Sequence, residues 1–337
     1  MRFPEFKGEW KTAILGDIVK SISSGKTKPS EGEYNLYGST GIIGRTPKPD
    51  YKGEMLLVAR VGANAGYLQL INEQCGITDN TLIVVPTDVP TKYLYYFLLH
   101  LNLNRLVFGS GQPLITGGML KKIKVQIGTK KEQDKISNLL SLLDERITTQ
   151  NKIIDKLQSL IKGIAQNIVS NNKPNIRLSD CLDCSSSTLQ ESDVCETGIY
   201  PVYGANGIVG YLDNYNTEGE AVYIIKDGSG VGTVSYATGK CSATGTLNTL
   251  QAKDGYSLQY LYYILKVFNF EPYKTGMAIP HIYFKDYGKA KIFCPSYTEQ
   301  LRYARLQSAI DSKLSVEKNI LTSLSSQKQY LLRQMFI

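Results

Sequence analysis

The chain has 337 residues, of which 42% are hydrophobic and 20% are charged, and its formal net charge is +8. This composition is that of a soluble globular protein with two to three domains, each able to bury its own core. No run of about 18 apolar residues occurs, and the N-terminus MRFPEFKGEW lacks the apolar stretch of a signal peptide, so we expect a cytoplasmic protein without membrane segments.

The positive charge is concentrated in the first half of the chain. Residues 1–170 carry 22 Lys and Arg against 15 Asp and Glu, whereas residues 171–337 carry 16 against 15. A positive balance suits a polyanionic partner such as nucleic acid, although the second half is nearly neutral. The six scattered cysteines predict reduced thiols, and the close pair Cys181 and Cys184 lacks a second pair of ligands for a zinc site.

In chain order, short β-rich runs come first. Residues 10–128 contain predicted strands separated by glycine-bearing turns, together with a predicted helix over Lys92–Arg105. A long helix without internal proline is then predicted over residues 132–170. The second half follows the same order, with a β-rich body over residues 176–295 and a helix from Thr298 to the C-terminus. The predicted strands of the first half are Met55–Ala59, Tyr67–Ile71, Thr81–Val85 and Ile123–Ile127.

The second half repeats the first at an offset of 166 or 167 residues. YGSTGIIG at residues 37–44 recurs as YGANGIVG at residues 203–210, and the glycines of VGANAG recur in DGSGVG. The matches fall on glycines, turn residues and apolar anchors, which determine backbone shape, while the positions between them differ. We therefore expect one domain-sized scaffold used twice with two different surfaces. Further matches are Tyr93-Leu-Tyr-Tyr with Tyr260-Leu-Tyr-Tyr and Glu132-Gln133 with Glu299-Gln300.

Both long helices carry a heptad seam, which is typical of a coiled coil. Gln150 and Glu317 occupy the same seam position in the two copies, so an antiparallel pair in full overlap brings them together at its centre, where they would set the register. The alternative is that both face solvent through a local stutter. In the weaker second seam, Leu306 and Leu332 are expected to compensate at the edges. Antiparallel pairing also makes the two termini neighbours, and helices of about 39 residues, roughly 60 Å long, would hold the two β-rich bodies apart. The two seams are Ile136, Leu140, Leu143, Ile147, Gln150, Ile154, Leu157, Ile161, Ile164 and Ile168, and Tyr303, Gln307, Ile310, Leu314, Glu317, Leu321, Leu324, Lys328, Leu331 and Met335.

The opening RFPEFKGEWKTAILGDI, the two YGxxGIxG turns, the segments GSGQPLI and TGMAIPHI, and the two EQ-initiated helices together resemble the specificity subunit of type I restriction–modification systems. The resemblance covers the whole chain. It implies an α+β fold in which two β-rich target-recognition domains are joined by two long helices forming an antiparallel coiled coil, a pseudo-two-fold tandem repeat. The domains would be residues 1–128 and 173–295, and the helical spacers residues 129–172 and 296–337.

By that resemblance, each β-rich domain reads one half of an asymmetric, two-part site on double-stranded DNA. The helices set the spacing and dock two modification (methyltransferase) subunits, and restriction (translocase and nuclease) subunits join in the full complex. S-adenosylmethionine, ATP and Mg would belong to those partners, and this chain would be a non-catalytic subunit. The second copy departs from the pattern at its entry, where IRLSDCLDCSSS retains only the LxD shape, so the start of its domain is defined only to within several residues.

Catalytic motifs are missing from the sequence. It contains no Asn/Asp-Pro-Pro-Tyr/Phe motif for amino methylation and no P-loop, and no acid-x-Lys follows Pro49-Asp50 on a nearby predicted strand to complete a nuclease motif. DGSGVG resembles a phosphate loop, but its pairing with VGANAG favours a structural turn. Two other classes stay open: a coiled-coil scaffold whose β-domains bind protein, and an enzyme. The first is favoured by residues 171–295, with 10 Lys and Arg against 12 Asp and Glu. The second lacks a convergent set of acid, base or metal ligands.

Candidate DNA contacts lie at variable positions beside the repeated glycine turns. Polar side chains on such loops read base edges, whereas cations and serine position phosphates. Each candidate has a plain alternative, a solvated lysine or, for His281, a hydrogen-bonded structural residue; the Tyr-Leu-Tyr-Tyr segments are expected in the core. The candidates are Lys26, Lys28, Arg60, Asn64 and Gln112 in the first copy and Lys226, Ser229, His281, Tyr283 and Lys285 in the second.

Overall fold

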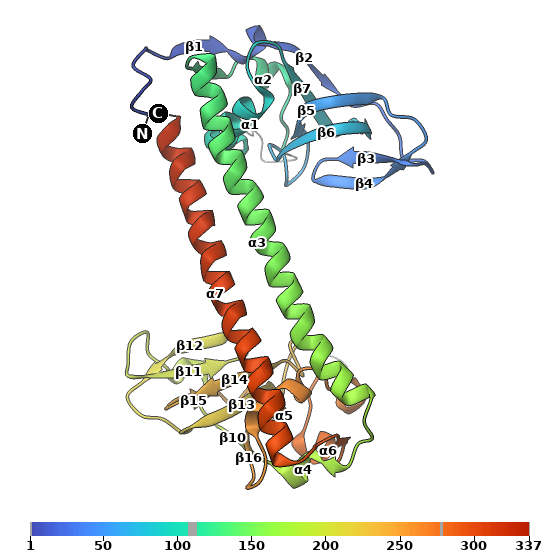
Figure 1. The fold of residues 1–337 in the computed structure, drawn as a ribbon, viewed down its shortest axis with the longest axis vertical. Coiled ribbons are helices and arrows are strands. Elements are labelled where there is room, and N and C mark those ends of the chain that lie inside the picture. The colour runs from blue at the N-terminus through green and yellow to red at the C-terminus, as the bar shows by residue number, and fades with distance from the viewer. Residues whose placement is uncertain (1, 107–112, 277–278, 337) are drawn as a thin grey trace. The chain divides into compact units, whose positions relative to one another are not determined.

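Two β-rich bodies and two long helices make up the computed structural model of this chain, which describes residues 2–106, 113–276 and 279–336 (Figure 1). The chain divides into unit 1, Met1–Asn151 with Ile320–Ile337, and unit 2, Lys152–Asn319. Each unit therefore holds one β-rich body and one portion of each long helix. Within the described part of the chain, no helix combines the length and the apolar character that crossing a membrane requires.

Unit 1 is built on a six-stranded sheet with the order β2-β7-β5-β6-β3-β4, in which only the β3–β6 pair is parallel. A separate antiparallel pair, β1–β8, precedes the long helix. Its strands are β1 (Lys11–Ile14), β2 (Val19–Ser24), β3 (Tyr34–Gly38), β4 (Gly41–Thr46), β5 (Tyr51–Ala59), β6 (Leu68–Ile77), β7 (Thr81–Pro86) and β8 (Lys124–Ile127). Its short helical elements are η1 (Leu15–Asp17), α1 (Thr91–Leu101), η2 (Leu103–Leu106) and α2 (Gly117–Lys121).

Unit 2 repeats this topology strand for strand, as two sheets with the orders β10-β16-β13-β14 and β12-β11-β15, and the pair β17–β9. The counterpart of β6 is divided into β14 and β15, and Gly239 between them adopts a φ of 87°. Its strands are β9 (Ile176–Arg177), β10 (Leu182–Ser186), β11 (Tyr200–Gly204), β12 (Gly207–Leu212), β13 (Glu220–Ile225), β14 (Val234–Thr238), β15 (Ser242–Ala243), β16 (Leu247–Ala252) and β17 (Lys291–Ile292). Its short helical elements are α4 (Leu178–Cys181), η3 (Glu191–Asp193), α5 (Leu258–Leu265), η4 (Glu271–Tyr273) and α6 (Phe284–Tyr287).

The predicted duplication and the α+β class are confirmed, even in detail. The YGxxGIxG turns form the β3–β4 and β11–β12 hairpins, and the strand register shifts at the same place in both, before Tyr37 and before Tyr203. The LxD shape at the entry of each copy also has one structural meaning, since Leu15 and Leu178 each begin a short helical turn and are fully buried. The predicted helix over Lys92–Arg105 ends earlier than expected, at Leu101. Asn102 adopts the left-handed conformation (φ 54°) that terminates it.

The Tyr-Leu-Tyr-Tyr segments lie on α1 and α5 and form part of the core, as predicted. Tyr93 and Tyr260 are fully buried, and each hydroxyl donates to a backbone carbonyl, Gln126 O at 2.7 Å and Phe293 O at 2.8 Å. One turn later, Tyr96 and Tyr263 donate to carboxylates on the long helices. Burial thus fixes each β-rich body against a long helix through pairs of tyrosines.

The long helices are α3 (Lys130–Ser170) and α7 (Tyr297–Met335), and they pack antiparallel within each unit. In unit 1, Lys328 binds Asp144, and Gln150 lines a groove with Ile320. In unit 2, the Nε2 of Gln307 donates to the backbone carbonyl of Ile161 at 3.2 Å.

The predicted seam is confirmed, since every seam residue in both helices is buried or half-buried. Gln150 and Glu317 are 8% and 6% exposed, which contradicts the alternative that both face solvent. Their meeting at the centre stays a prediction. Leu332 is buried as expected, but Leu306 is 51% exposed and does not compensate for the weaker seam.

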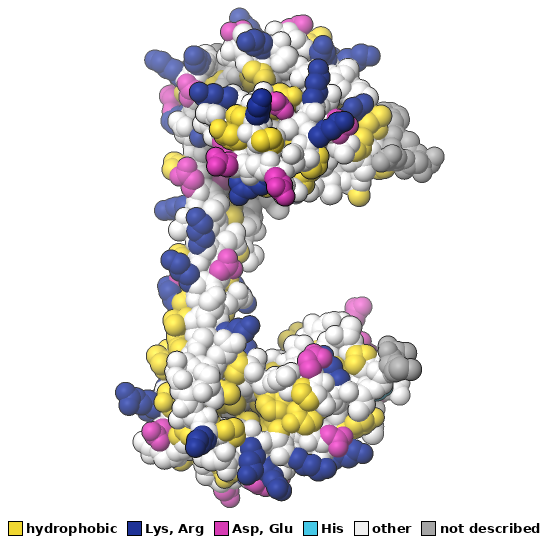
Figure 2. All heavy atoms as spheres, turned by 90° about the vertical axis from the view of Figure 1, so that its right-hand side faces the viewer, with side chains coloured by type: hydrophobic (Ala, Val, Ile, Leu, Met, Phe, Trp, Pro, Cys, Tyr) yellow, Lys and Arg dark blue, Asp and Glu magenta, His cyan; other side chains and the backbone are white. Residues whose placement is uncertain are grey.

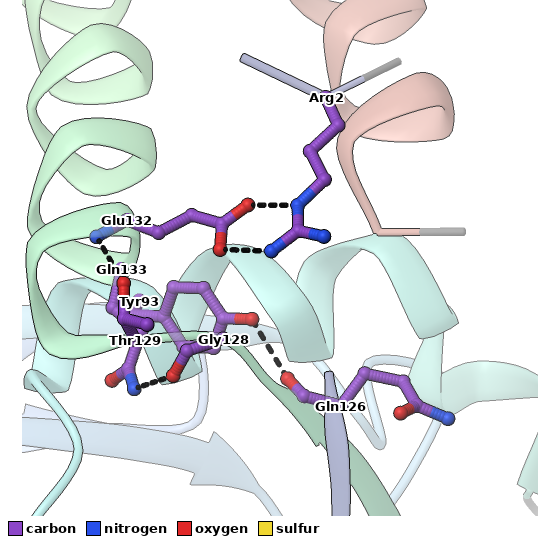
Figure 3. A network of polar contacts seen from close by, with 7 residues as sticks. All are labelled: Arg2, Tyr93, Gln126, Gly128, Thr129, Glu132 and Gln133. Carbon is purple, nitrogen blue, oxygen red and sulfur yellow. Dashed lines mark hydrogen bonds and ion pairs between the residues drawn. The ribbon is translucent and has the colours of Figure 1, made fainter. Parts of the chain in front are cut away.

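The repeated EQ dipeptide has one shared role and one divergent role, and Figure 3 shows its first copy, Glu132 and Gln133. Gln133 and Gln300 each donate from Nε2 to the carbonyl just before the long helix, Gly128 O and Pro295 O, both at 2.9 Å. The glutamates differ. Glu132 is fully buried and accepts two hydrogen bonds from the Arg2 guanidinium at 2.6 and 2.8 Å, whereas exposed Glu299 accepts from the backbone N–H and hydroxyl of Ser296.

The two ends of the chain are neighbours in unit 1, as antiparallel pairing predicts. Phe3 packs against the same hydrophobic cluster as Met335 and Phe336. The ring of Phe336 lies edge-on to Tyr93, with ring centroids 5.5 Å apart. The last turn of α7 therefore completes the core of the first β-rich body.

Candidate nucleic-acid interface

The sheet register of unit 1 brings several predicted contact residues to one edge. Ser24 at the end of β2 and Ala59 at the end of β5 pair with the first residues of β7. The next residues bond to the start of β7 and to the turn before it, since Gly25 N donates to Thr81 O at 3.0 Å and Arg60 N donates to Asn80 O at 2.9 Å. The loops that begin with Lys26 and with Arg60 thus leave the sheet side by side.

A second segment crosses this edge. Gly62 N donates to Pro113 O at 3.0 Å, Ile115 N donates to Arg60 O at 2.8 Å, and Val61 forms a β-bridge with Leu114. Gly62 has a φ of 81°, a backbone conformation that residues with a side chain rarely adopt. The turn therefore needs glycine, which explains why Gly62 recurs as Gly228. Asn64 is exposed in the same loop, and Gln112 lies outside the described residues.

Unit 2 makes the same crossing with the same bonds. Lys226 N donates to Thr246 O at 3.0 Å, Gly228 N to Pro280 O at 3.0 Å, and Ile282 N to Lys226 O at 2.9 Å. Asp227 forms the β-bridge with His281. Two candidate groups that are more than 50 residues apart in the chain therefore meet at this edge.

The side chains of unit 2 form a connected series here. His281 Nδ1 lies 2.6 Å from Asp227 Oδ1. The His281 ring lies 6.5 Å from the Tyr283 ring at an angle of 22°, and the Lys285 ammonium lies 5.2 Å from the Tyr283 ring. Ser229 is exposed on the neighbouring loop. The arrangement presents an imidazole, a phenol and a cation together.

The corresponding edge of unit 1 is different in character. Val61 and Leu114 make an apolar bridge, and Leu114 is 36% exposed. The Nε of Arg60 is buried and has no hydrogen-bond partner among the described residues. Lys26 and Lys28 are exposed in the β2–β3 loop.

Sequence reasoning did not single out Val61, Leu114 and Asp227, because it weighed only cationic, amide, hydroxyl and imidazole side chains as contacts. The offset of 166 or 167 residues sets Val61 against Asp227 and Leu114 against His281, so comparison of the two copies would have singled them out. The distribution of charged side chains does not mark the candidate interface. In the face shown in Figure 2, Lys and Arg side chains are scattered among acidic ones rather than gathered in one patch.

The six cysteines are free thiols, and Cys195 is exposed. Burial raises the pKa of Cys181 to about 12 and that of Cys184 to about 11, so both side chains stay protonated at neutral pH. Across residues 2–106, 113–276 and 279–336, no group of three or more His, Cys, Asp or Glu side chains is placed to hold a metal ion.

Each unit also contains a cavity beside a tyrosine that binds a long helix, Tyr96 of α1 in unit 1 and Tyr263 of α5 in unit 2. In unit 1 a cavity of about 930 Å³ is lined by His100, Asp144 and Lys328, and Asp144 accepts from Tyr96 at 2.8 Å. In unit 2 a cavity of about 430 Å³ is lined by Tyr263 and Asp311, which are 2.7 Å apart. These cavities border the long helices and are separate from the strand-end edge.

Comparison with known proteins gives a family match in both halves of the chain. The type I restriction modification DNA specificity domain matches residues 7–159 and again residues 174–326. A type I specificity subunit of Mycoplasma genitalium is 26% identical over 91% of this chain and 87% of that protein, and one of Mycoplasma pneumoniae is 25% identical over 97% and 96%. The EcoprrI specificity subunit of Escherichia coli is 26% identical over 50% of this chain and 44% of its own length.

Solved structures agree in fold. A crystal structure of the type I restriction–modification S subunit from M. genitalium has a TM-score of 0.77 at 21% identity, covering 99% of this chain and 97% of that one. A chain from a structural study of complex assembly and conformational transition in the type I restriction–modification system has a TM-score of 0.56 at 13% identity, covering 98% of both.

Proposed function

This chain belongs to the type I restriction modification DNA specificity family, and from that premise we propose that each of its two units reads one half of an asymmetric, two-part DNA site. It is a DNA sequence-recognition subunit of a type I restriction–modification system. The observation that supports the two-part site is the strand-end edge, which has the same backbone bonds in both units and different side chains.

The DNA site can be asymmetric because the two DNA-reading units belong to one chain and are not identical. A symmetric homodimer presents identical surfaces and favours a palindrome. Here the two edges carry different groups, Val61 with Leu114 in one unit and Asp227 with His281 in the other. The two half-sites would therefore differ in sequence.

The polar residues at these edges are our candidates for DNA contact. Lys26 and Lys28 would position phosphates, while Arg60 and Asn64 would read a guanine or adenine edge. In unit 2, Lys226 and the series His281, Tyr283 and Lys285 would take these roles, with Ser229 as a phosphate donor. Their convergence on one edge supports the proposal, and all of them are exposed except Arg60, Lys226 and His281, which are half-buried.

The finer roles of the helices and partners are also proposals. We infer that α3 and α7 set the spacing of the half-sites and dock two modification subunits. The two equivalent cavities beside the long helices support one docking place per unit. The chain itself would be non-catalytic, with S-adenosylmethionine, ATP and Mg bound by the modification and restriction subunits. Apart from the near-neutral charge of residues 171–295, no observation on the described residues favours a scaffold whose β-domains bind protein.

A genome-wide map of N6-methyladenine tests this function. Cells with and without the gene for this chain, both keeping the partner genes, should differ by one split motif that disappears on deletion. Exchange of residues 1–128 for those of another specificity subunit should then change one half of the motif and leave the other. If no methylation changes although the partners are expressed, the function is refuted. Binding of the purified complex to DNA should also weaken steeply with salt, because phosphate contacts release counterions, whereas a protein scaffold would show no such slope.

A further inference from the structure

The β-bridge at the strand-end edge is the place where the two units share a backbone and differ most in chemistry. In each unit one residue of the glycine loop is paired with one residue of the crossing segment, as Val61 with Leu114 and Asp227 with His281. The flanking hydrogen bonds are equivalent, 3.0 Å to the proline carbonyl and 2.8 or 2.9 Å from the isoleucine N–H. The bridge therefore sits at the same place in both readers.

The two bridges offer opposite surfaces. Val61 and Leu114 can make only apolar contact. The side chains of Asp227 and His281 are 37% and 35% exposed and lie 2.6 Å apart, so they form a hydrogen-bonding pair that is still open to a ligand. Neither bridge is fully buried, so packing of the core does not dictate this difference.

From this we propose that the bridge pair is a specificity determinant, and that it reads one base pair in each half-site. The inference rests on the proposed function, since it assumes that the two units read different halves. Because the backbone around the bridge is the same in both units, the two bridges would contact equivalent positions of their half-sites. The different side chains would then select different bases at that position.

The chemistry of each bridge indicates its base. In unit 2, an ionised Asp227 can only accept, so it selects the form of His281 whose Nδ1 carries the proton, and when that ring is neutral its Nε2 is an acceptor. An acceptor in the major groove pairs with the exocyclic amino group of adenine or cytosine. Asp227 is thus a positioning residue that selects the tautomer of His281. In unit 1, Leu114 with Val61 suits the 5-methyl group of thymine.

Reciprocal exchange of the two bridges tests the proposal in cells that carry the partner genes. The variants are D227V/H281L in unit 2 and V61D/L114H in unit 1, with D227N as the conservative variant and D254V as the control. Asp254 is an exposed acid beyond the opposite end of β16, so D254V makes the same change in polarity away from the edge. The readout is the methylated motif, position by position.

D227V/H281L is expected to lower discrimination at one base pair of one half-site by about 5- to 150-fold, with the other half unchanged. V61D/L114H should do the same to the other half-site. D227N should retain most of the preference, since its Oδ1 still accepts from Nδ1, and D254V should leave the motif as it is. Thermal unfolding of each purified variant establishes that the chain is folded.

Different outcomes separate this inference from the proposed function. If deletion of the gene changes no methylation, the proposed function fails. If the wild-type motif depends on the gene but both exchanges leave it unaltered, only the bridge proposal fails. For a variant that abolishes methylation, the purified complex is tested on duplexes randomised across the motif. Flattened preference at one position supports the proposal, and a uniform loss of binding with unchanged preference overturns it.

Discussion

Replacing Pro90 with serine should stabilise unit 1, because the two copies differ at the N-cap residue that precedes their short helices. Ser257 caps α5 and donates its backbone N–H to Gln300 Oε1 at 2.9 Å, while its hydroxyl accepts from Tyr260 N. Its counterpart in unit 1 is Pro90, which has no N–H and provides no side-chain cap. Accordingly, the Oε1 of the buried Gln133 lacks a hydrogen-bond partner among the described residues.

The expected gain follows from three terms. A buried acceptor left unsatisfied costs about 1–3 kcal/mol, and a serine cap contributes about 0.5–2 kcal/mol. Loss of proline's restriction of the unfolded chain offsets about 0.4–1 kcal/mol of this. Pro90 has φ −54° and ψ 134°, which serine adopts without strain. The net effect of Pro90→Ser is then an increase of about 2 kcal/mol in the free energy of unfolding, and Pro90→Ala, which restores only the N–H, should give about half of it.

Urea unfolding followed by tryptophan fluorescence measures the change in the free energy of unfolding of unit 1. Trp10 is the only tryptophan in the chain, and it packs against the core of unit 1. The reciprocal variant Ser257→Pro should destabilise unit 2, as followed by circular dichroism. If Pro90→Ser leaves the Trp10 transition unchanged or lowers its midpoint, while Ser257→Pro has its expected effect, the unsatisfied Gln133 acceptor is not a source of instability and the reasoning is wrong.

Three further predictions concern unit 1, the tyrosine anchors and the chain ends. Arg2→Ala should lower the Trp10 unfolding midpoint by leaving the buried Glu132 carboxylate unpaired, and adding Glu132→Gln should recover part of the loss; no recovery would refute the pairing argument. Tyr96→Phe and Tyr263→Phe should each lower the free energy of unfolding by about 1.5 kcal/mol in denaturant titrations. If Tyr96→Phe costs the same when Asp144→Asn is already present, the hydrogen bond between Tyr96 and Asp144 is not the cause of the loss. Burial raises the pKa of both tyrosines, so stability should be intact below pH of about 10 and fall as pH rises beyond it, less steeply in the phenylalanine variants. A circular permutant opened between residues 170 and 174, with the neighbouring termini joined, should fold with an unchanged circular dichroism spectrum, and a failure to fold would count against antiparallel pairing.

Much of the fold was predictable because it is encoded in short-range patterns. Alternating three- and four-residue spacing defines the seams of α3 and α7, and the observed burial follows that spacing. The glycine turns repeat because positions such as Gly62 and Gly228 need a positive φ in both copies. The end of the first short helix at Leu101 has a weaker local signal, since Asn102 terminates it in place of a proline or glycine.

The candidate interface shows where such patterns stop. The sequence by itself determined that the chain is a duplication with two long helices, because spacing and turn chemistry act between near neighbours. Only the tertiary structure decided that the loops of Lys26 and Arg60 leave one edge together, and that Asp227 meets His281, 54 residues away. Such meetings depend on the register between distant strands, and a shift of one residue would turn every side chain to the other face of the sheet.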